Sequence, residues 1–186
     1  MMIDGKNITR AYFIGIGGIG MSALAQLMKD AGCAVSGSDR EESPVTVMLR
    51  DKGIDVHFIQ DGKGVPLNAD VAVYSEAVWE DNPERMRAKE LGIREMSYFE
   101  VLGEVSKEKT TIAVSGTNGK TTTTGMLAKI LADAGAHPTA VVGSIVKDFH
   151  SNYLAGSSDL FVVEACEYKR DFLTLSPTIL VVTNIE

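Results

Sequence analysis

The sequence predicts an α/β protein with two parallel-sheet units in series, and three observations support this. Short apolar segments alternate with stretches of helical periodicity, an order typical of parallel strands joined by right-handed crossovers. Clusters of glycine at 15–20 and 116–119 each stand between an apolar segment and a helical stretch. With 186 residues, 45% of them hydrophobic, the chain can bury a core without disulfides or metal ions.

The first half of the chain shows the alternation most clearly. Between Met21 and Ala31 the apolar residues recur at helical spacing, and Gly32 suits the end of this helix. We expect further helices at about 45–52 and 83–91, and strands at 12–14, 34–36, 54–58 and 70–74.

The second half repeats this order with fewer elements. A strand at 111–114 precedes a helix at 120–134, and short buried strands are expected at 160–163 and 179–182. The polar stretch Ser106–Lys109 separates the halves, which differ in charge: residues 1–106 carry 11 basic and 17 acidic side chains, and the remainder 7 and 8. We therefore expect domains at 1–106 and 107–186.

Composition narrows the class of protein. The net charge of −7 argues against a general nucleic-acid or anionic-membrane binder, because such proteins present basic surfaces. No apolar run approaches the roughly 20 residues that span a bilayer, and the first residues do not resemble a signal peptide. Two cysteines, Cys33 and Cys166, are too few for a disulfide framework. We expect a reduced, cytoplasmic protein.

The first glycine cluster, Gly15-Ile-Gly17-Gly18-Ile-Gly20, fits the pattern G-x-G-x-x-G between a strand and a helix. Glycines allow the backbone to approach a diphosphate, and the helix N-terminus supplies amide donors. Asp39 ends the next strand, where its carboxylate can accept hydrogen bonds from ribose hydroxyls. The pattern predicts a Rossmann-like domain but does not separate a dinucleotide from a nucleotide-sugar, so an NAD-dependent oxidoreductase stays an alternative.

The second cluster has the chemistry of a phosphate loop. It runs Gly116-Thr117-Asn118-Gly119-Lys120-Thr121-Thr122 and departs from G-x-x-x-x-G-K-[ST] because position 114 is valine. Backbone amides can cradle phosphate oxygens, Lys120 can reach the β- and γ-phosphates of ATP, and Thr121 can place its hydroxyl on Mg²⁺. The second half is therefore expected to be a P-loop-type α/β ATPase domain.

A carboxylate at the end of a neighbouring strand usually completes such a magnesium site. Glu164 follows the apolar strand at 160–163 and is the predicted ligand together with Thr121; Glu167 is a weaker candidate. The basic pair Lys169-Arg170 is interpreted as solvated. The histidines have no partner at metal-ligand spacing and are interpreted as strand or loop residues, at positions 57, 137 and 150.

These motifs resemble the Mur ligases, the ATP-dependent amide-forming enzymes of peptidoglycan assembly. The phosphate loop carries the resemblance to the family as a whole. Within the family, the branch that joins L-alanine to UDP-N-acetylmuramate is similar in Gly15–Ser22, Gly37-Ser-Asp39, Ser75-Glu-Ala, Asp81-Asn-Pro83, Glu164-Ala-Cys-Glu-Tyr and Val182-Thr-Asn-Ile-Glu186. The resemblance extends over essentially the whole chain.

The resemblance implies a reaction and its ligands. ATP would phosphorylate the muramate carboxylate, and the amine of L-alanine would displace phosphate from the acyl phosphate. Lys120 would be the catalytic residue, with ATP on 116–122 and Mg²⁺ on Thr121 and Glu164. UDP-N-acetylmuramate would bind at Gly15, Gly17, Gly18, Ile19, Gly20, Met21, Ser22, Asp39 and Ser75.

Two further alternatives stand beside the oxidoreductase. The murein-tripeptide recycling ligase of the same family shares most of the motifs, and an incomplete chain would be a non-catalytic nucleotide-binding module. The family implies an ATPase domain that continues past position 186 and a C-terminal domain beyond it, so the resemblance implies that the P-loop-type α/β ATPase domain is incomplete here. We therefore expect a fragment that is inactive alone, with an exposed apolar edge in its second unit.

Overall fold

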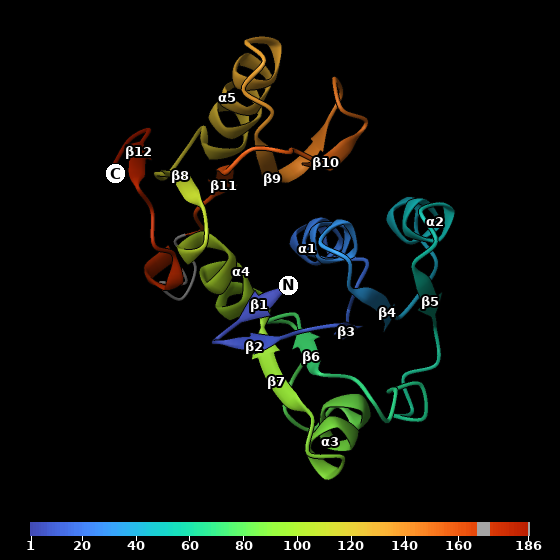
Figure 1. Ribbon diagram of the computed structural model, residues 1–186. Coiled ribbons are helices and arrows are strands. Elements are labelled where there is room, and N and C mark those ends of the chain that lie inside the picture. The colour runs from blue at the N-terminus through green and yellow to red at the C-terminus, as the bar shows by residue number, and fades with distance from the viewer. Residues whose placement is uncertain (167–171, 186) are drawn as a thin grey trace. The chain divides into compact units, whose positions relative to one another are not determined.

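The computed structural model describes residues 1–166 and 172–185, and the chain divides into two compact units, Met1–Val101 and Leu102–Glu186 (Figure 1). The division falls inside helix α4 (Tyr98–Lys107), close to the polar stretch at 106–109. Each unit has helices packed on its own sheet, so the expected α/β fold class is confirmed.

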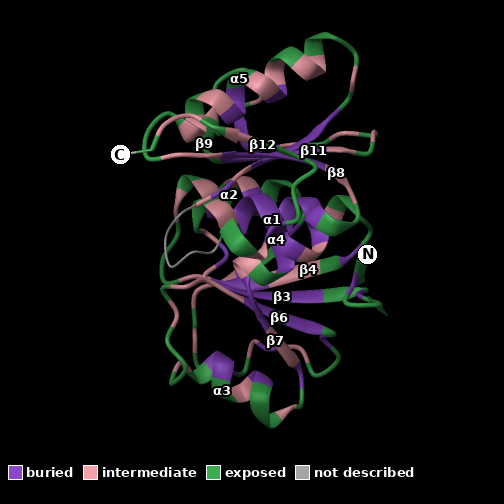
Figure 2. Ribbon diagram, turned by 90° about the vertical axis from the view of Figure 1, so that its left-hand side faces the viewer, coloured by how far each residue is buried: buried purple, intermediate pink, exposed green. Residues whose placement is uncertain are grey.

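The first unit contains a five-stranded parallel sheet in the order β5-β4-β3-β6-β7. Helices α1 and α2 cover one face of this sheet and α3 the other (Figure 2). The chain leaves the central strand β3 toward β4 and β5, and later returns to the opposite side for β6 and β7. Such a switch point opens a crevice at the carboxyl ends of the strands, where ligands bind in open α/β sheets. The elements are β3 (Arg10–Ile14), α1 (Ile19–Asp30), β4 (Ala34–Ser38), α2 (Pro44–Asp51), β5 (Asp55–His57), β6 (Val71–Tyr74), α3 (Pro83–Glu90) and β7 (Arg94–Ser97), preceded by the hairpin β1 (Met2–Ile3) and β2 (Lys6–Asn7).

Local sequence explains where the shorter helices begin. Ser43 and Thr46 form a reciprocal capping box at the start of α2, and Pro44 occupies the first helical turn. Asn82 caps α3 by accepting hydrogen bonds from the amides of Glu84 and Arg85, again followed by a proline. Both caps fix loops that lead out of the strands on either side of β3, namely β4 and β6.

The second unit has a mixed sheet in the order β10-β9-β11-β8-β12, with α5 packed on it. The expectation of parallel strands throughout is wrong for β10, which runs antiparallel to β9. Only residues 147–150 connect these two strands, and a connection this short can join antiparallel neighbours only. The elements are β8 (Thr110–Ser115), α5 (Lys120–Asp133), β9 (Thr139–Val146), β10 (Ser151–Leu154), β11 (Leu160–Glu164) and β12 (Ile179–Val182).

Strand β12 corrects a second expectation. It was expected to be buried, but Ile179 and Leu180 are 51% and 58% exposed, whereas β11 is buried at its centre. In the described part of the chain β12 is an edge strand that pairs with β8 on one side. Within the described residues, no helix has the length and apolar character needed to cross a membrane.

Candidate nucleotide-binding sites

The glycine turn of the first unit is closed by hydrogen bonds to the end of β4. Gly15 has a φ of +82°, and the amides of Gly15 and Ile16 both donate to the carbonyl of Ser38 at 2.9 Å. The amide of Gly17 donates to Oδ2 of Asp39 at 2.6 Å. The carboxylate therefore holds the turn in addition to being available to a ligand.

Gly17 is required by space. A Cβ atom at this position would lie 2.8 Å from Oδ2 of Asp39 and 2.9 Å from Cγ2 of Thr46. Both distances are shorter than real carbon contacts, so any side chain at position 17 would displace the carboxylate. The glycine pattern and the acid downstream thus form one structural unit.

A cavity of about 460 Å³ opens beside this turn at the carboxyl edge of the sheet. Its lining brings together four predicted residues, Gly15, Gly18, Asp39 and Ser75. Gly17 lies in the turn itself, and the first turn of α1 holds the other four, Ile19, Gly20, Met21 and Ser22. Met21 and Ser22 are buried, and the Ser22 hydroxyl donates to the carbonyl of Ile19 at 2.9 Å. Any contribution of these residues to a ligand would come from backbone amides, as at other helix N-termini. The rest of the lining is Arg40, Gln60, Ala77, Val78, Trp79, Asp81, Asn82 and Pro83.

Arg85 holds the loop that forms one wall of this cavity. Its guanidinium donates to the carbonyl of Val78 at 3.0 Å and to Glu95 at 2.7 Å, and lies 3.7 Å from the ring centre of Tyr74. Arg85 is 7% exposed, so these contacts are shielded from solvent. Trp79, on the loop, is 80% exposed and reaches the cavity rim.

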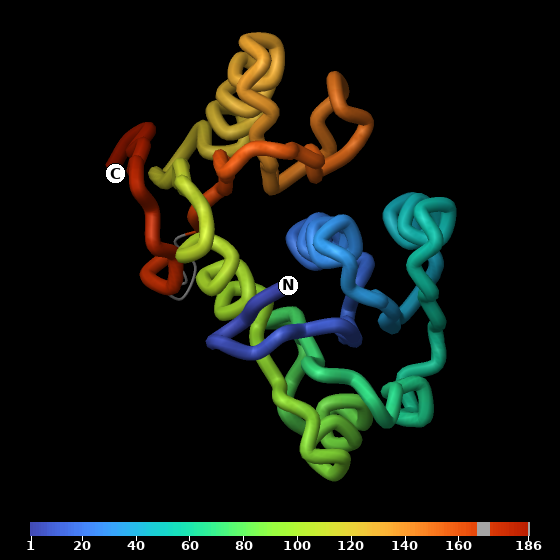
Figure 3. Tube along the Cα trace, viewed as in Figure 1, coloured from blue at the N-terminus to red at the C-terminus, as the bar shows by residue number. Residues whose placement is uncertain are grey.

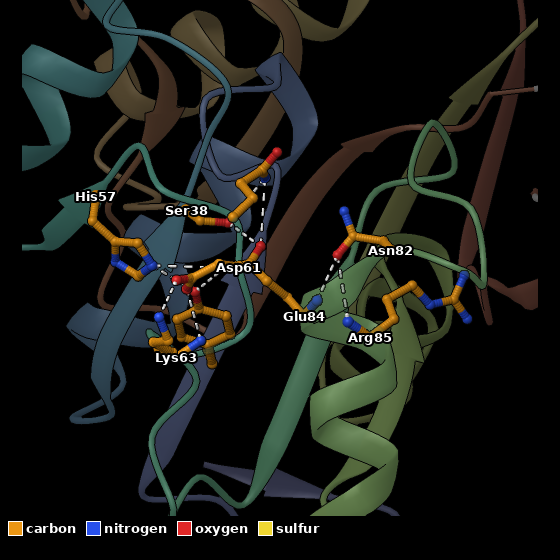
Figure 4. A network of polar contacts seen from close by, with 9 residues as sticks. Ser38, His57, Asp61, Lys63, Asn82, Glu84 and Arg85 are labelled. Carbon is orange, nitrogen blue, oxygen red and sulfur yellow. Dashed lines mark hydrogen bonds and ion pairs between the residues drawn. The ribbon is translucent and has the colours of Figure 1, made fainter.

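A buried polar network reaches the lining of this cavity through Gln60, and sequence reasoning missed it. Glu84 is fully buried and accepts hydrogen bonds from the hydroxyls of Tyr12 and Ser38, each at 2.5 Å (Figure 4). His57 Nε2 lies 2.9 Å from the Tyr12 oxygen and 3.6 Å from Glu84. Gln60 donates to Ser38 at 3.1 Å and also lines the cavity. Burial, followed by the contact with Glu84, raises the pKa of the Tyr12 hydroxyl above its usual value.

His57 itself lies in β5, which confirms its interpretation as a strand residue. Its carboxylate partner is 27 positions away in the chain, a separation at which no ligand spacing can be recognised.

The phosphate loop connects β8 directly to α5, as the chain trace shows (Figure 3). Gly119 starts the helix in the left-handed conformation with a φ of +81°, and among the described residues no side chain caps this helix. Two of the four threonines at 121–124 make hydrogen bonds that explain their presence. Thr124 donates back to the carbonyl of Lys120 at 2.8 Å, and Thr121 donates to Glu164. The start of α5 can therefore accept an anion.

Residues 183–184 brace the loop from the end of β12. The Thr183 hydroxyl donates to the carbonyls of Asn118 at 2.5 Å and Ser115 at 3.2 Å. Asn184 accepts hydrogen bonds from the amides of Asn118 and Thr117. Gly116, with a φ of +131°, is required here, because a Cβ would lie 2.1 Å from the Thr183 hydroxyl.

The side chain of Lys120 folds back onto the phosphate loop. Its ammonium donates to the carbonyl of Gly116 at 2.7 Å and to that of Thr117 at 3.2 Å. The positive charge is thereby held beside the amides that would receive phosphate oxygens.

Thr121 and Glu164 meet as predicted. The Thr121 hydroxyl donates to Oε1 of Glu164 at 3.0 Å, although β11 and α5 are distant in sequence. Two hard oxygen donors side by side at a phosphate loop fit Mg²⁺, which is held by few protein ligands together with phosphate oxygens and water. No group of three or more His, Cys, Asp or Glu suited to a metal gathers anywhere in residues 1–166 and 172–185. Glu167, Lys169 and Arg170 lie outside the described residues.

Comparison with known families assigns both units. The family described as "Mur ligase family, catalytic domain" matches residues 10–110, more than half of the chain. The chain belongs to the Mur ligase family. The "Mur ligase middle domain" matches residues 114–186 of this Mur ligase chain, which carry the phosphate loop.

Relatives and solved structures support the assignment over both units. The UDP-N-acetylmuramate–L-alanine ligases of Caldicellulosiruptor saccharolyticus and Persephonella marina are 45% and 44% identical over 96% and 100% of the chain. The chain spans about two fifths of the length of these relatives, 39% and 40%.

The crystal structure of a UDP-N-acetylmuramate-alanine ligase from Thermotoga maritima matches 97% of the chain, and 42% of its own, with a TM-score of 0.90 at 34% identity. The UDP-N-acetylmuramate:L-alanyl-gamma-D-glutamyl-meso-diaminopimelate ligase from Neisseria meningitides gives 0.87 at 31% identity and covers 97% of the chain and 61% of its own.

Proposed function

We propose that this chain is the UDP-N-acetylmuramate- and ATP-binding part of a ligase that joins L-alanine to UDP-N-acetylmuramate. One observation carries the proposal: a Mur ligase chain holds a cavity with a glycine turn and Asp39, and separately a phosphate loop with Lys120, Thr121 and Glu164. The relatives named for this reaction cover nearly the whole chain.

The cavity beside Gly15 supplies what a nucleoside diphosphate needs. Backbone amides of the turn and of the first turn of α1 would receive the diphosphate, and Asp39 would accept hydrogen bonds from ribose hydroxyls. Ser75 lies at the same edge of the sheet. Arg40 and Trp79, which also line the cavity, would enclose the base of the nucleotide.

The phosphate loop would bind ATP through residues 116–122. Lys120 would neutralise charge on the transferred γ-phosphoryl group and is the proposed catalytic residue. Thr121 and Glu164 would hold Mg²⁺, which would neutralise negative charge on the phosphates of ATP when bound. The γ-phosphoryl group would pass to the muramate carboxylate with release of ADP, and the amine of L-alanine would then displace inorganic phosphate to form the amide.

The murein-peptide ligase is a second candidate, favoured by the similar structure from Neisseria meningitides. It would use the same two sites with a peptide in place of L-alanine. The oxidoreductase alternative uses only the first unit and leaves the pair Thr121–Glu164 without a role.

Ligand binding to this chain tests the proposal. In thermal-shift and calorimetric titrations, we expect UDP-N-acetylmuramate and Mg-ATP each to bind and NAD to leave the melting temperature unchanged. Stabilisation by NAD without stabilisation by UDP-N-acetylmuramate would refute it. We expect no alanine-dependent ADP release, since the chain has about two fifths of its relatives' length.

A further inference from the structure

Gly143, in β9, contacts the carboxylate that the proposed metal site uses. Its backbone amide donates to Oε2 of Glu164 at 2.8 Å. The other oxygen of the same carboxylate, Oε1, accepts the hydrogen bond of the Thr121 hydroxyl. The two oxygens of Glu164 therefore have different partners on opposite sides of the side chain.

The position of Gly143 leaves its amide available for this contact. The parallel pairing of β9 with β11 ends at Val141 and Val163, two residues before Gly143. Beyond that point β9 becomes exposed, whereas the residues from Thr139 to Val142 are buried. The amide turns to the side chain that ends β11 instead of to its backbone.

Space explains why position 143 is glycine. A Cβ atom there would lie 2.5 Å from Oε2, 2.8 Å from Cδ and 2.9 Å from Oε1 of Glu164. The φ of Gly143 lies outside the left-handed region, so alanine could adopt the same backbone conformation. An added methyl group would act only by pushing the carboxylate away.

We propose that Gly143 is a positioning residue for the divalent cation of the ATP site. Its amide occupies Oε2 of Glu164 and leaves Oε1, on the Thr121 side, as the single oxygen presented to the metal. A one-oxygen carboxylate suits the strict octahedral geometry of Mg²⁺, whereas Ca²⁺ accepts two oxygens from one carboxylate. This inference rests on the proposed ATP-binding function.

The test compares the affinity for ATP with Mg²⁺ and with EDTA, by calorimetry on the whole chain. In Gly143→Ala, we expect the gain in affinity that Mg²⁺ provides to fall roughly 10-fold or more, with binding in EDTA unchanged. Gly125→Ala is the matched control, because its Cβ would meet Val146 at an ordinary 3.4 Å. An unchanged magnesium gain in Gly143→Ala overturns the inference. Failure of the unaltered chain to bind ATP at all overturns the proposed function instead.

A second measurement does not depend on the folding of a variant. In ¹H–¹⁵N spectra of the unaltered chain, we expect the Gly143 amide to stay downfield and protected from exchange when Mg-ATP is added. Loss of its hydrogen bond on addition of Mg-ATP would overturn the inference, because both carboxylate oxygens would then be free for the metal.

Discussion

The two glycine loops of this chain share one local design and differ in the charge beside it. Each follows a parallel strand, contains a glycine with positive φ (Gly15 and Gly116) and leads into a helix. In the first, the carboxylate of Asp39 receives the Gly17 amide at 2.6 Å. In the second, the ammonium of Lys120 lies 2.7 Å from the carbonyl of Gly116.

Under the proposed function, the loop backbone would bind phosphate in both units, and the neighbouring charged side chain would select what the phosphate is attached to. A carboxylate disfavours a polyphosphate tail and favours hydroxyl donors such as those of ribose. A lysine at the start of the helix favours the charge of β- and γ-phosphates. Removing each charged group in turn should therefore weaken the binding of one nucleotide and leave the affinity for the other unchanged.

Lys120→Met should have the largest effect. We expect ATP affinity to fall roughly 10- to 100-fold, because a hydrogen bond from a charged donor to phosphate contributes about 1.5–3 kcal/mol. Affinity for UDP-N-acetylmuramate should not change. Calorimetry measures both, and Lys129→Met is the control, since Lys129 pairs with Asp133 near the far end of the same helix. Equal losses for both nucleotides would contradict the comparison.

Asp39→Asn should lower the affinity for UDP-N-acetylmuramate by about 10-fold and leave the affinity for ATP unchanged. The amide oxygen can still receive the Gly17 hydrogen bond, so the turn should persist while the charge is lost. Trp79, the single tryptophan of the chain and part of the cavity rim, provides a fluorescence titration. Asp51→Asn, at the end of α2, is the control. Unchanged binding of UDP-N-acetylmuramate would restrict Asp39 to holding the turn.

The sequence predicts the parts of both sites that depend on local order. Periodicity predicts the helices that follow the loops, and the rule that ligands gather at the carboxyl ends of parallel strands predicts Asp39 and Glu164. The hydrogen bond between Thr121 and Glu164 shows only that the two predicted metal ligands lie side by side. Ligand binding by the predicted residues stays a prediction.

The remaining features depend on contacts between distant segments. Thr183 reaches Asn118 across 65 positions, and Glu84 reaches Tyr12 across 72, so neither contact has a local signal. Strand β7, with the polar sequence Arg-Glu-Met-Ser, lacks the apolar run that marks β3 and β6 of its sheet. It is recognisable only from its pairing with β6.

Thr183→Val sharpens the comparison, because only the second loop is braced from the edge strand of its sheet. The substitution removes the single hydroxyl donor, which Asn118 and Ser115 share through their carbonyls, while keeping the side-chain volume. We expect ATP affinity to fall about 3- to 10-fold, since each neutral hydrogen bond contributes roughly 0.5–1.5 kcal/mol. UDP-N-acetylmuramate titrated on the same sample is the internal control. A lower melting temperature with normal ATP affinity would show that the brace is structural alone.

The smallest expected effect is on stability, and it concerns a feature that each unit has at the amino ends of its strands. Asp70, just before β6, accepts hydrogen bonds from the amide and hydroxyl of Thr9 and the amide of Arg10. Asp159, just before β11, accepts those of the amide and hydroxyl of Thr110. Each acid thus fastens the start of the strand that leads to a glycine loop.

The hydrogen bonds from the Thr9 amide and hydroxyl, followed by that of Arg10, hold the pKa of Asp70 below its usual value. Because the folded pKa is depressed, the stabilisation is present above the unfolded value of about 3.9 and is lost as the pH falls through the folded pKa. We expect Asp70→Asn to lower the urea midpoint modestly at pH 6, and the difference between the unaltered chain and the variant to shrink as the pH falls through the folded pKa of Asp70. Urea titrations followed by Trp79 fluorescence, which reports on the first unit, measure this difference. A midpoint difference that stays constant from pH 6 to pH 3 would show that the charge of Asp70 contributes nothing, and that the acid acts at this position only as a neutral hydrogen-bond acceptor.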